Sequence, residues 1–215
     1  LFDTDFLSCL SANASAEKMM ERLSGPLGIH ELRFKRYPCG APTHSGIINC
    51  KKIIAEHQIK PEEIEKIIFE PYPRAIRLVG ITHPKTGLEG KFSIPFTAAA
   101  QIVFGRVTME TFTDEAVQNP DVLHLLDRME MIPNDEFTAS RGGRATILLK
   151  DGREFSNSTY LLGHELNLDE SEKEVSEKYG EILNPRLGPE RTEAIYREIM
   201  NLDKAGQFNV LCSLL

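Results

Sequence analysis

Apolar and polar residues alternate along the stretch GIHELRFKRYP, residues 28–38. Leu32 and Phe34 point to one side of such a stretch, and Arg33 and Lys35 point to the other. An alternation with a period of two is typical of a strand that buries one face. The pattern therefore predicts a half-buried strand here, with Lys35 on its outward face.

Helical spacing replaces this alternation farther along the chain. Residues 42–57 carry apolar residues three and four positions apart, and Pro42 suits the first turn of a helix. Residues 94–104 form a second predicted helix that is rich in small residues. Ser93 precedes it as an N-cap, and Gly105 ends it. A further short helix is predicted to begin at Asn119-Pro120.

Strand signals accompany these helices. Residues 64–69 read as a strand that the prolines at 71 and 73 stop. RATILLKDGREFSNS reads as a hairpin in which Asp151-Gly152 makes a type I′ turn. Because strands and helices mix without a regular strand–helix–strand alternation, the sequence predicts an α+β fold. We expect an antiparallel sheet packed with helices.

Segments of helical character flank this predicted module. We place the α+β module at residues 28–160, preceded by residues 1–27 and followed by a charged helical tail, residues 161–215. The apolar positions of both flanks lack an evident partner within the chain. The sequence also starts in the middle of an amphipathic pattern. We therefore expect a piece of a longer protein.

Composition narrows the functional classes. Hydrophobic residues make up 41% and charged residues 27%, and the net charge is −7. An acidic balance argues against nucleic acid or an anionic membrane as the main partner. No apolar run is long enough to span a bilayer. The 4 cysteines are scattered without metal-ligand spacing, so we expect no metal and free thiols in a reducing compartment.

Lys35 and His44 are the candidate catalytic residues. A histidine in the first turn of the 42–57 helix feels the positive end of the helix dipole, which favours the neutral imidazole. Free N–H groups at the same helix start favour a carboxylate, and a lysine on a long stem can reach that anion. Together they would form a pocket for an anionic substrate that loses or gains a proton. The alternative is a solvated lysine and a capping histidine.

The run FKRYPCGAPTHSGIINC resembles the lysine–aromatic–proline segment of the MmgE/PrpD family. The resemblance continues in order through IKPEEIEKI, through HPKTGLEGKFSIPFTAAAQIVFGRVTMETFTDE and NPDVLHLLDRMEM, and to the hairpin ILLKDGREFSNS. It covers most of residues 20–185. Ordered agreement over such a length is more specific than any single motif.

The resemblance implies a two-domain protein in which an α+β lid, residues 28–160, covers a large helical domain that is mostly absent from this chain. Residues 1–27 would end that helical domain, and residues 161–215 would return to it. Members of the family dehydrate, decarboxylate or epimerise small polycarboxylic acids without a metal or other cofactor. The implied active site lies between the domains, with the functional lysine at Lys35 and the histidine at His44. The intact protein would be a homodimer in the cytoplasm or, in a eukaryote, the mitochondrial matrix.

Other side chains near these two are candidate substrate contacts. They are Tyr37 and Thr43 in the first motif, and Lys91 and Ser93 in GKFSIPF. Tyr37 either orients the substrate through its hydroxyl or fills space. Ser93 is otherwise a plain N-cap, and Lys91 a solvated cation. Cys39 could act as a nucleophile or could be a small thiol that packs in the interior. Because no histidine partner is fixed beside it, the packing role is favoured.

The resulting first hypothesis is a lyase of the 2-methylcitrate dehydratase type. Its alternatives are decarboxylation of cis-aconitate or epimerisation on the same scaffold. A third is a non-catalytic lid that binds a small acid or a partner. Because the chain carries only one wall of an interdomain cleft, we expect no activity from it alone.

Overall fold

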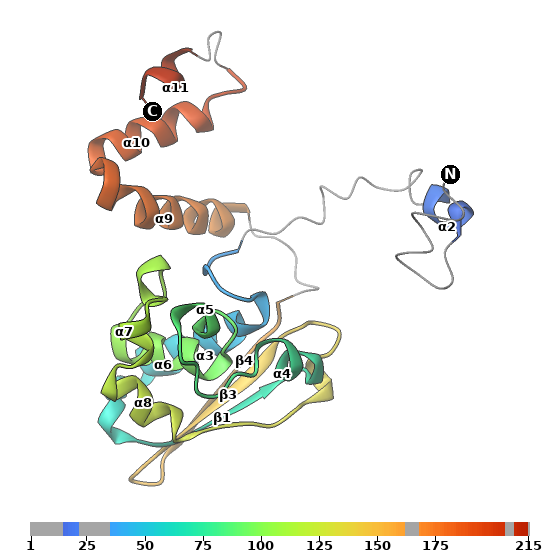
Figure 1. Ribbon diagram of the computed structural model, residues 1–215, viewed down its shortest axis with the longest axis vertical. Helices are drawn as coiled ribbons and strands as arrows, with labels where there is room; N and C mark the ends of the chain where they lie inside the picture. Colours follow the sequence, from blue (N-terminus) through green and yellow to red (C-terminus); the bar gives the residue numbers. More distant parts are fainter. Residues whose placement is uncertain (1–14, 22–34, 162–167, 205–208, 215) are drawn as a thin grey trace. The chain divides into compact units, whose positions relative to one another are not determined.

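The computed structural model describes residues 15–21, 35–161, 168–204 and 209–214 (Figure 1). The chain divides into two compact units, residues 1–34 and residues 35–215. The described part of the first unit, residues 15–21, contains helix α2, Ala16–Glu21. Most of the strand predicted over 28–38 lies outside the described residues, and residues 36–39 at its end form bends.

A four-stranded sheet organises the second unit, in the order β2-β1-β3-β4 (Figure 1). Its strands are β1, Ile64–Pro71; β2, Met129–Met131; β3, Gly143–Leu149; and β4, Glu154–Thr159. β1 pairs antiparallel with β3, and β3 pairs antiparallel with β4. The short β2 pairs parallel with β1, with Ile67 opposite Met129. The predicted α+β fold is confirmed, and β2 adds one parallel pairing to the sheet.

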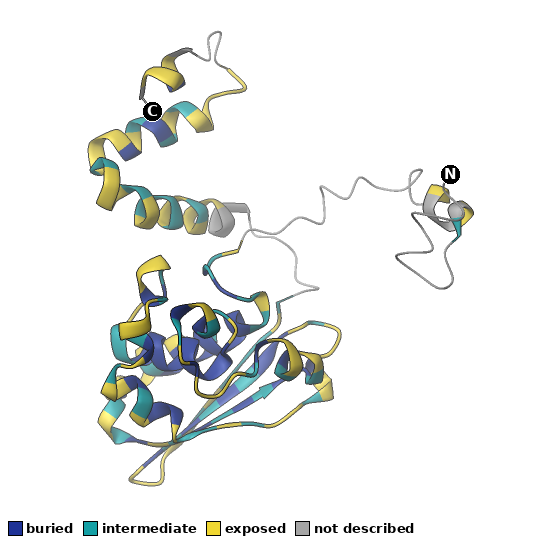
Figure 2. Ribbon diagram, viewed as in Figure 1, coloured by how far each residue is buried: buried dark blue, intermediate teal, exposed yellow. Residues whose placement is uncertain are grey.

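The sheet buries one of its faces. Along β1, Ile67 and Phe69 are buried, and opposite them on β3 Ala145 and Ile147 are buried as well. The residues between them, such as Ile68, are only half-buried. Helix α3, His44–His57, packs on β3 and β4, and α6, Ile94–Phe104, packs on α3. Figure 2 shows the buried residues concentrated where these helices meet the sheet.

Helix α6 begins and ends where the sequence predicts. The Ser93 hydroxyl accepts a hydrogen bond from the Phe96 N–H, which satisfies one of the free donors of the first turn. Gly105 follows the helix with a φ of 71°, a left-handed conformation that glycine adopts without strain. Its N–H donates to the carbonyl of Gln101.

Short helices connect these main elements. They are η4, Ala41–Thr43; η5, Pro61–Glu63; α4, Pro73–Val79; α5, Gly87–Gly90; η6, Met109–Thr111; α7, Asp114–Val117; α8, Pro120–Leu126; and η7, Asp135–Phe137. The predicted helix at Asn119-Pro120 is α8, whose first turn the Asn119 side chain caps. The segment HPKTGLEG contains α5, where the Thr86 hydroxyl accepts a hydrogen bond from the Glu89 N–H.

The hairpin between β3 and β4 has a different turn from the one predicted. A type I′ turn needs positive φ at both central residues, but Asp151 does not have it and Gly152 does, with a φ of 87°. The Gly152 N–H donates to the Leu149 carbonyl, and the Leu149 N–H donates to the Arg153 carbonyl. This bonding is typical of a type I turn followed by a glycine bulge. Asp151 thereby avoids the strained conformation.

The tail of the second unit is helical, as predicted. Helices α9, Leu168–Leu187, and α10, Pro189–Met200, pack on each other, and α11, Asn209–Leu214, follows them. Gly188 separates α9 from α10 with a φ of 79°. Among the described residues, no helix is long and apolar enough to cross a membrane.

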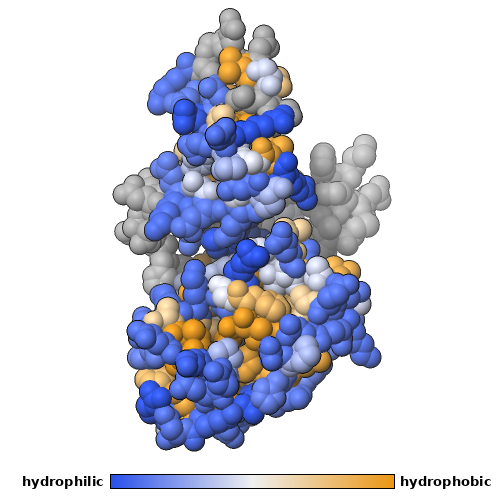
Figure 3. Space-filling model, turned by 90° about the vertical axis from the view of Figure 1, so that its left-hand side faces the viewer, coloured by the Kyte–Doolittle hydropathy of each residue, from blue (hydrophilic) through white to orange (hydrophobic). Residues whose placement is uncertain are grey.

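Apolar side chains also reach the surface of the α+β module. On the side drawn in Figure 3 they gather in the lower part of the molecule within a hydrophilic border. The exposed large apolar residues of the α+β module include Leu78, Ile81, Leu88, Phe92 and Met109. Apolar surface of this kind often marks a contact with another domain or protein.

Candidate active site

The segment that leads from Lys35 to His44 folds back on itself before α3 begins. The Lys35 Nζ atom donates to the carbonyl of Cys39 at 3.2 Å. One residue later, the Gly40 N–H donates to the carbonyl of Lys91 at 2.8 Å. The 3₁₀ turn η4 then delivers the chain into α3, with His44 as its first residue. Lys35 and His44 therefore lie at the two ends of one turn, residues 35–44.

Gly40 is required at this turn by space. A Cβ atom built on it would lie 2.7 Å from Cγ1 of Val79 and 3.3 Å from the carbonyl oxygen of Lys91. Both distances are shorter than a normal contact between these atoms. The absence of a side chain at Gly40 lets this loop and the loop of Lys91 share a backbone hydrogen bond.

His44 is held in its neutral form. Its residue surface is 8% exposed, and the Tyr37 ring packs edge-on against its imidazole at a centroid distance of 5.2 Å. Burial lowers the pKa of His44 to about 4, with a further lowering by the Lys35 charge; a hydrogen bond with the Tyr37 backbone offsets part of this. The predicted neutral imidazole follows mainly from desolvation.

The two ring nitrogens of His44 have different surroundings. Nε2 is buried, and among the residues that the structure describes it has no hydrogen-bond partner. The hydrogen bond with the Tyr37 backbone therefore belongs to Nδ1, which donates to that carbonyl. Nε2 is left as an unprotonated acceptor. A buried acceptor without a partner is costly in a folded protein and often indicates a functional position.

Lys35 and Lys91 bring positive charge to the same turn. Lys35 is exposed, and Lys91 is half-buried with its Nζ atom 5.6 Å from the centre of the Phe112 ring. Both ammonium groups act electrostatically on the Cys39 thiol and lower its pKa, so each lies within reach of that side chain. The structure thus brings Lys35, Lys91 and His44 to one region, although Lys35 is exposed and His44 is buried.

Cys39 and Thr43 form a buried pair beneath these charges. The Cys39 Sγ atom lies 2.9 Å from the Thr43 Oγ1 atom, which donates to the Gly40 carbonyl at 2.8 Å. Burial raises the pKa of the Cys39 thiol to about 11, against the opposing effects of Thr43 and the two lysines. A thiol in this state is a packing group and a poor nucleophile. The proton of the Thr43 hydroxyl is already donated to the Gly40 carbonyl.

Ser93 is fully buried at the start of α6. Its hydroxyl accepts from the Phe96 N–H and donates to the Ile81 carbonyl. Both bonds tie the helix start to the preceding loop. A role of Ser93 or Thr43 in substrate binding stays a prediction.

Arg36 was not a candidate on sequence grounds, yet it anchors the Lys35 segment to α9. Its guanidinium makes two hydrogen bonds of 2.9 Å to the two carboxylate oxygens of Glu181, and Glu177 lies 3.6 Å away. The Lys178 ammonium group donates to the Lys35 carbonyl. Arg36 and Glu181 are 145 positions apart, so no local pattern could have indicated the pair.

The chain also matches the model of a known protein family. The model of the MmgE/PrpD C-terminal domain matches residues 37–204, which is most of the chain. The chain belongs to the MmgE/PrpD family. The match covers the turn of Tyr37 and His44, the sheet and helices α9 and α10, so the MmgE/PrpD C-terminal domain includes the helical tail.

Three relatives are similar to this MmgE/PrpD chain. Human cis-aconitate decarboxylase is 25% identical over 193 residues, covering 86% of this chain and 40% of the relative. The 2-methylcitrate dehydratase of Yarrowia lipolytica, a mitochondrial protein, is 26% identical over 157 residues, covering 66% of this chain and 30% of the relative. The cis-aconitate decarboxylase-like protein oryM of Aspergillus oryzae is 22% identical over 135 residues, covering 61% of this chain and 28% of the relative. The chain therefore spans less than half the length of these relatives.

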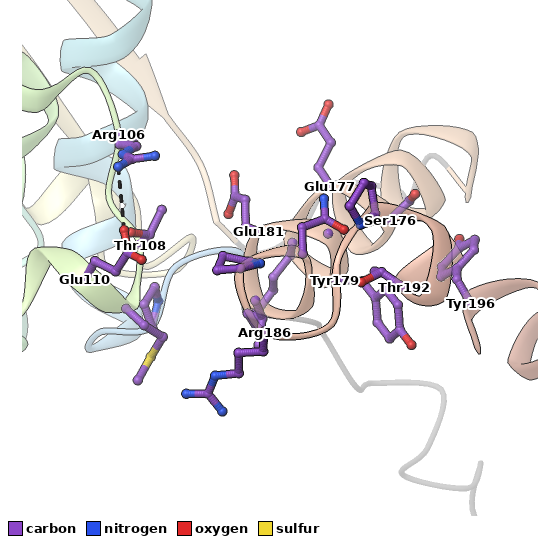
Figure 4. A pocket seen from close by; sticks show the side chains of 18 of the residues that line it. Arg106, Thr108, Glu110, Ser176, Glu177, Tyr179, Glu181, Arg186, Thr192 and Tyr196 are labelled. Carbon is purple, nitrogen blue, oxygen red and sulfur yellow. Dashed lines mark ion pairs between the residues drawn. The ribbon is translucent and has the colours of Figure 1, made fainter. Parts of the chain in front are cut away.

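A cavity of about 750 Å³ lies beside Arg36 in this MmgE/PrpD domain, between the 106–110 segment and helices α9 and α10 (Figure 4). The Arg106–Glu110 ion pair lines one side of it. Arg36 also contributes, but its charge is already balanced by α9. Neither Lys35 nor His44 lines this cavity, but Arg36 and Pro38, on either side of Tyr37, do. The cavity therefore adjoins the segment that carries the predicted site.

Metal-ligating side chains do not cluster in the described part of the chain. No three histidine, cysteine, aspartate or glutamate side chains gather there as a group that could hold an ion. The groups available for chemistry at the turn are the two ammonium groups, the imidazole of His44 and the hydroxyl of Tyr37.

Proposed function

We propose that this chain forms one wall of the active site of a lyase that acts on small polycarboxylic acids. Two relatives carry the names cis-aconitate decarboxylase and 2-methylcitrate dehydratase, and both names refer to compounds with several carboxylates. The proposed chemistry is metal-free proton transfer at a carbon next to a carboxylate. The remaining wall would come from a helical domain that this chain lacks.

The unpartnered Nε2 atom of His44 beside the Lys35 charge carries this proposal. A neutral imidazole with a free acceptor nitrogen can take a proton. The Lys35 ammonium group is exposed and can bind a substrate carboxylate, which stabilises the negative charge that develops when the neighbouring carbon loses its proton. The two groups thus have complementary roles.

Access to His44 requires a local movement. Nε2 is buried, and the Tyr37 ring packs against the imidazole. We propose that a rotation of the Tyr37 side chain uncovers the imidazole and brings the hydroxyl toward the substrate. A carboxylate that enters would raise the pKa of His44 from about 4 toward the working pH, because an opposite charge favours imidazolium.

The other candidates follow by position. Lys91 is proposed to bind a second carboxylate, since it shares the turn with Lys35 through the Gly40–Lys91 hydrogen bond. Thr43 and Ser93 are proposed to form the floor of this site. Each hydroxyl donates to a backbone carbonyl, so it would contact the substrate only by giving up that hydrogen bond. These assignments carry less of the chemistry than Lys35 and His44.

Dehydration of the 2-methylcitrate type is the first proposed reaction. His44 removes the proton next to a carboxylate held by Lys35, and the electron pair then forms the alkene as the β-hydroxyl group leaves. The departing hydroxyl takes the proton back from the His44 imidazolium and is released as water, so that His44 returns to its neutral form. Decarboxylation of cis-aconitate is the second, because one relative is named cis-aconitate decarboxylase and another is named a cis-aconitate decarboxylase-like protein. There CO₂ leaves, and a proton is returned to carbon. Epimerisation would need removal and return of one proton.

Incubation of the whole protein with 2-methylcitrate, citrate and cis-aconitate tests this proposal. Alkene absorbance reports dehydration, release of CO₂ reports decarboxylation, and conversion of 2-methylcitrate into a second diastereomer reports epimerisation. Loss of water or of CO₂ from any one acid supports the lyase class and selects the reaction, whereas epimerisation alone would make the protein an isomerase on the same scaffold. If none of the three acids is changed but one binds, the chain is instead a non-catalytic small-acid module.

Partners of the whole protein are also proposals. The exposed apolar residues of the α+β module are proposed to face the missing helical domain, and the whole protein is proposed to be a homodimer. Its proposed location is the cytoplasm or, in a eukaryote, the mitochondrial matrix.

A further inference from the structure

The segment that carries Lys35 and Tyr37 has no regular secondary structure. Residues 36–39 form bends, and no helix or strand bonding includes them. Ordering the backbone of a residue costs about 1–2 kcal/mol in conformational entropy, so such a segment needs other contacts to stay in one place. Its position therefore depends on its side chains.

Helix α9 supplies these contacts from the far end of the chain. The Arg36 guanidinium meets the Glu181 carboxylate in a two-pronged arrangement, both hydrogen bonds measuring 2.9 Å. The Arg36 side chain is 17% exposed, against 37% for that of Glu181. A partly shielded, two-pronged pair of this kind is among the stronger and more directional polar contacts. One turn earlier on α9, Lys178 binds the Lys35 carbonyl.

Arg36 stands between the two residues whose placement matters. Lys35 precedes it, and Tyr37 follows it with its ring centre 5.6 Å from the guanidinium carbon. The Tyr37 backbone and ring both contact His44. A displacement of Arg36 would therefore move the ammonium group and the aromatic ring relative to the imidazole.

We propose that Glu181, acting through Arg36, is a positioning residue that holds Lys35 and Tyr37 in register with His44. This inference rests on the proposed function, and it assigns a catalytic purpose to the helical tail. The hydrogen bonds of Glu181 go to Arg36. Its effect on the reaction passes through Arg36 and the backbone on either side of it.

The test uses the whole protein and the substrate that it converts. Glu181→Gln keeps the shape of the side chain and removes its charge. Glu172→Gln, an exposed position on the same helix, is the matched control. We expect kcat to fall about 10- to 100-fold in Glu181→Gln, since a displacement of about 1 Å costs up to that much, and to stay unchanged in the control. An unchanged or increased kcat in Glu181→Gln, with the fold intact, would overturn the proposal.

A double-mutant cycle separates this role from general destabilisation. Arg36→Ala and Glu181→Ala should each lower kcat, and the double variant should lower it no further than one single variant, because one contact is lost in each case. Additive losses would contradict a shared role.

The acid limb of the pH profile gives a second readout. The charged groups that lower the pKa of His44 are Lys35 and Lys178, and Tyr37 contacts its ring. Release of the segment takes both charges away, so the pKa of His44 rises and the acid limb of kcat/KM moves to higher pH in Glu181→Gln. A merely structural role would lower the amount of folded protein and leave the limb in place.

The two proposals fail in different ways. Normal turnover in both Lys35→Ala and His44→Ala refutes the proposed function. Loss of turnover in those two variants together with a normal Glu181→Gln variant refutes only the positioning role.

Discussion

The rings of Tyr37 and His44 meet edge-on, with their centroids 5.2 Å apart and their planes at 90°. This contact joins an irregular segment to the first residue of α3. An edge-to-face arrangement is the favoured geometry for such rings, and here it also helps to remove the imidazole from water. The neutral state of His44 and its unpartnered nitrogen both follow from this burial.

Replacement of either proposed catalytic residue should lower turnover without unfolding the protein. We expect Lys35→Ala and His44→Ala each to reduce kcat at least about 100-fold, the usual effect of losing an acid–base or charge-stabilising group. Lys52→Ala and His57→Ala, exposed positions on α3, are the matched controls. Steady-state kinetics measures kcat, and circular dichroism shows whether each variant is folded. Near-normal rates in both site variants would remove the pair from the mechanism.

His44 should make the stability of the chain depend on pH. Its pKa is lowered to about 4 by burial and by Lys35, so between that value and its ordinary range the unfolded chain binds more protons than the folded one. Stability then falls as the pH drops. The loss from pH 7 to pH 5 is about 2 kcal/mol for this group. Urea unfolding at both pH values should show it, and His44→Gln should show a smaller loss. An equal loss in the variant would contradict this origin.

The cysteines should differ in reactivity. Burial raises the pKa of Cys39 to about 11 and that of Cys50 to about 12, whereas Cys212 is exposed. Because the thiolate is the reactive form, iodoacetamide at pH 8 should modify Cys212 in the native chain and leave Cys39 and Cys50 unmodified. Peptide mass spectrometry measures this. Rapid modification of Cys39 would instead support its alternative role as a nucleophile.

Addition of one methyl group at Gly40 should destabilise the turn. In Gly40→Ala the new Cβ atom would lie 2.7 Å from Cγ1 of Val79, and overpacking of this kind costs about 1–3 kcal/mol. Urea unfolding measures the loss. Val79→Ala removes the clashing atom, so the double variant should lose less than the sum of the two single variants. A fully additive loss would show that the clash is not the cause.

The 215-residue chain should be inactive alone. It spans 40% of human cis-aconitate decarboxylase and less of the other two relatives, and the proposed site needs a second wall. We expect turnover from the whole protein and none from this chain under the same conditions. Measurable turnover by the isolated chain would show that its own residues suffice.

Local signals in the sequence predicted much of the fold. Ser93 and Gly105 are typical of helix ends, and α6 lies between them. The helix predicted from Pro42 is present as η4 and α3, with His44 at the junction. The hairpin is present, but its turn type was wrong, since Asp-Gly is compatible with more than one turn. The three-residue strand β2 gave too short a pattern to be recognised.

Contacts between distant residues decided the rest. The sequence by itself determined where most elements of the α+β module begin and end, because caps, turns and alternation act over a few neighbouring residues. It also placed Lys35 and His44 in one short motif. Only the tertiary structure decided that His44 is buried and lacks a partner for Nε2 among the described residues, and that Arg36 pairs with Glu181. Burial and long-range pairing depend on which segments pack together, and no local pattern specifies that.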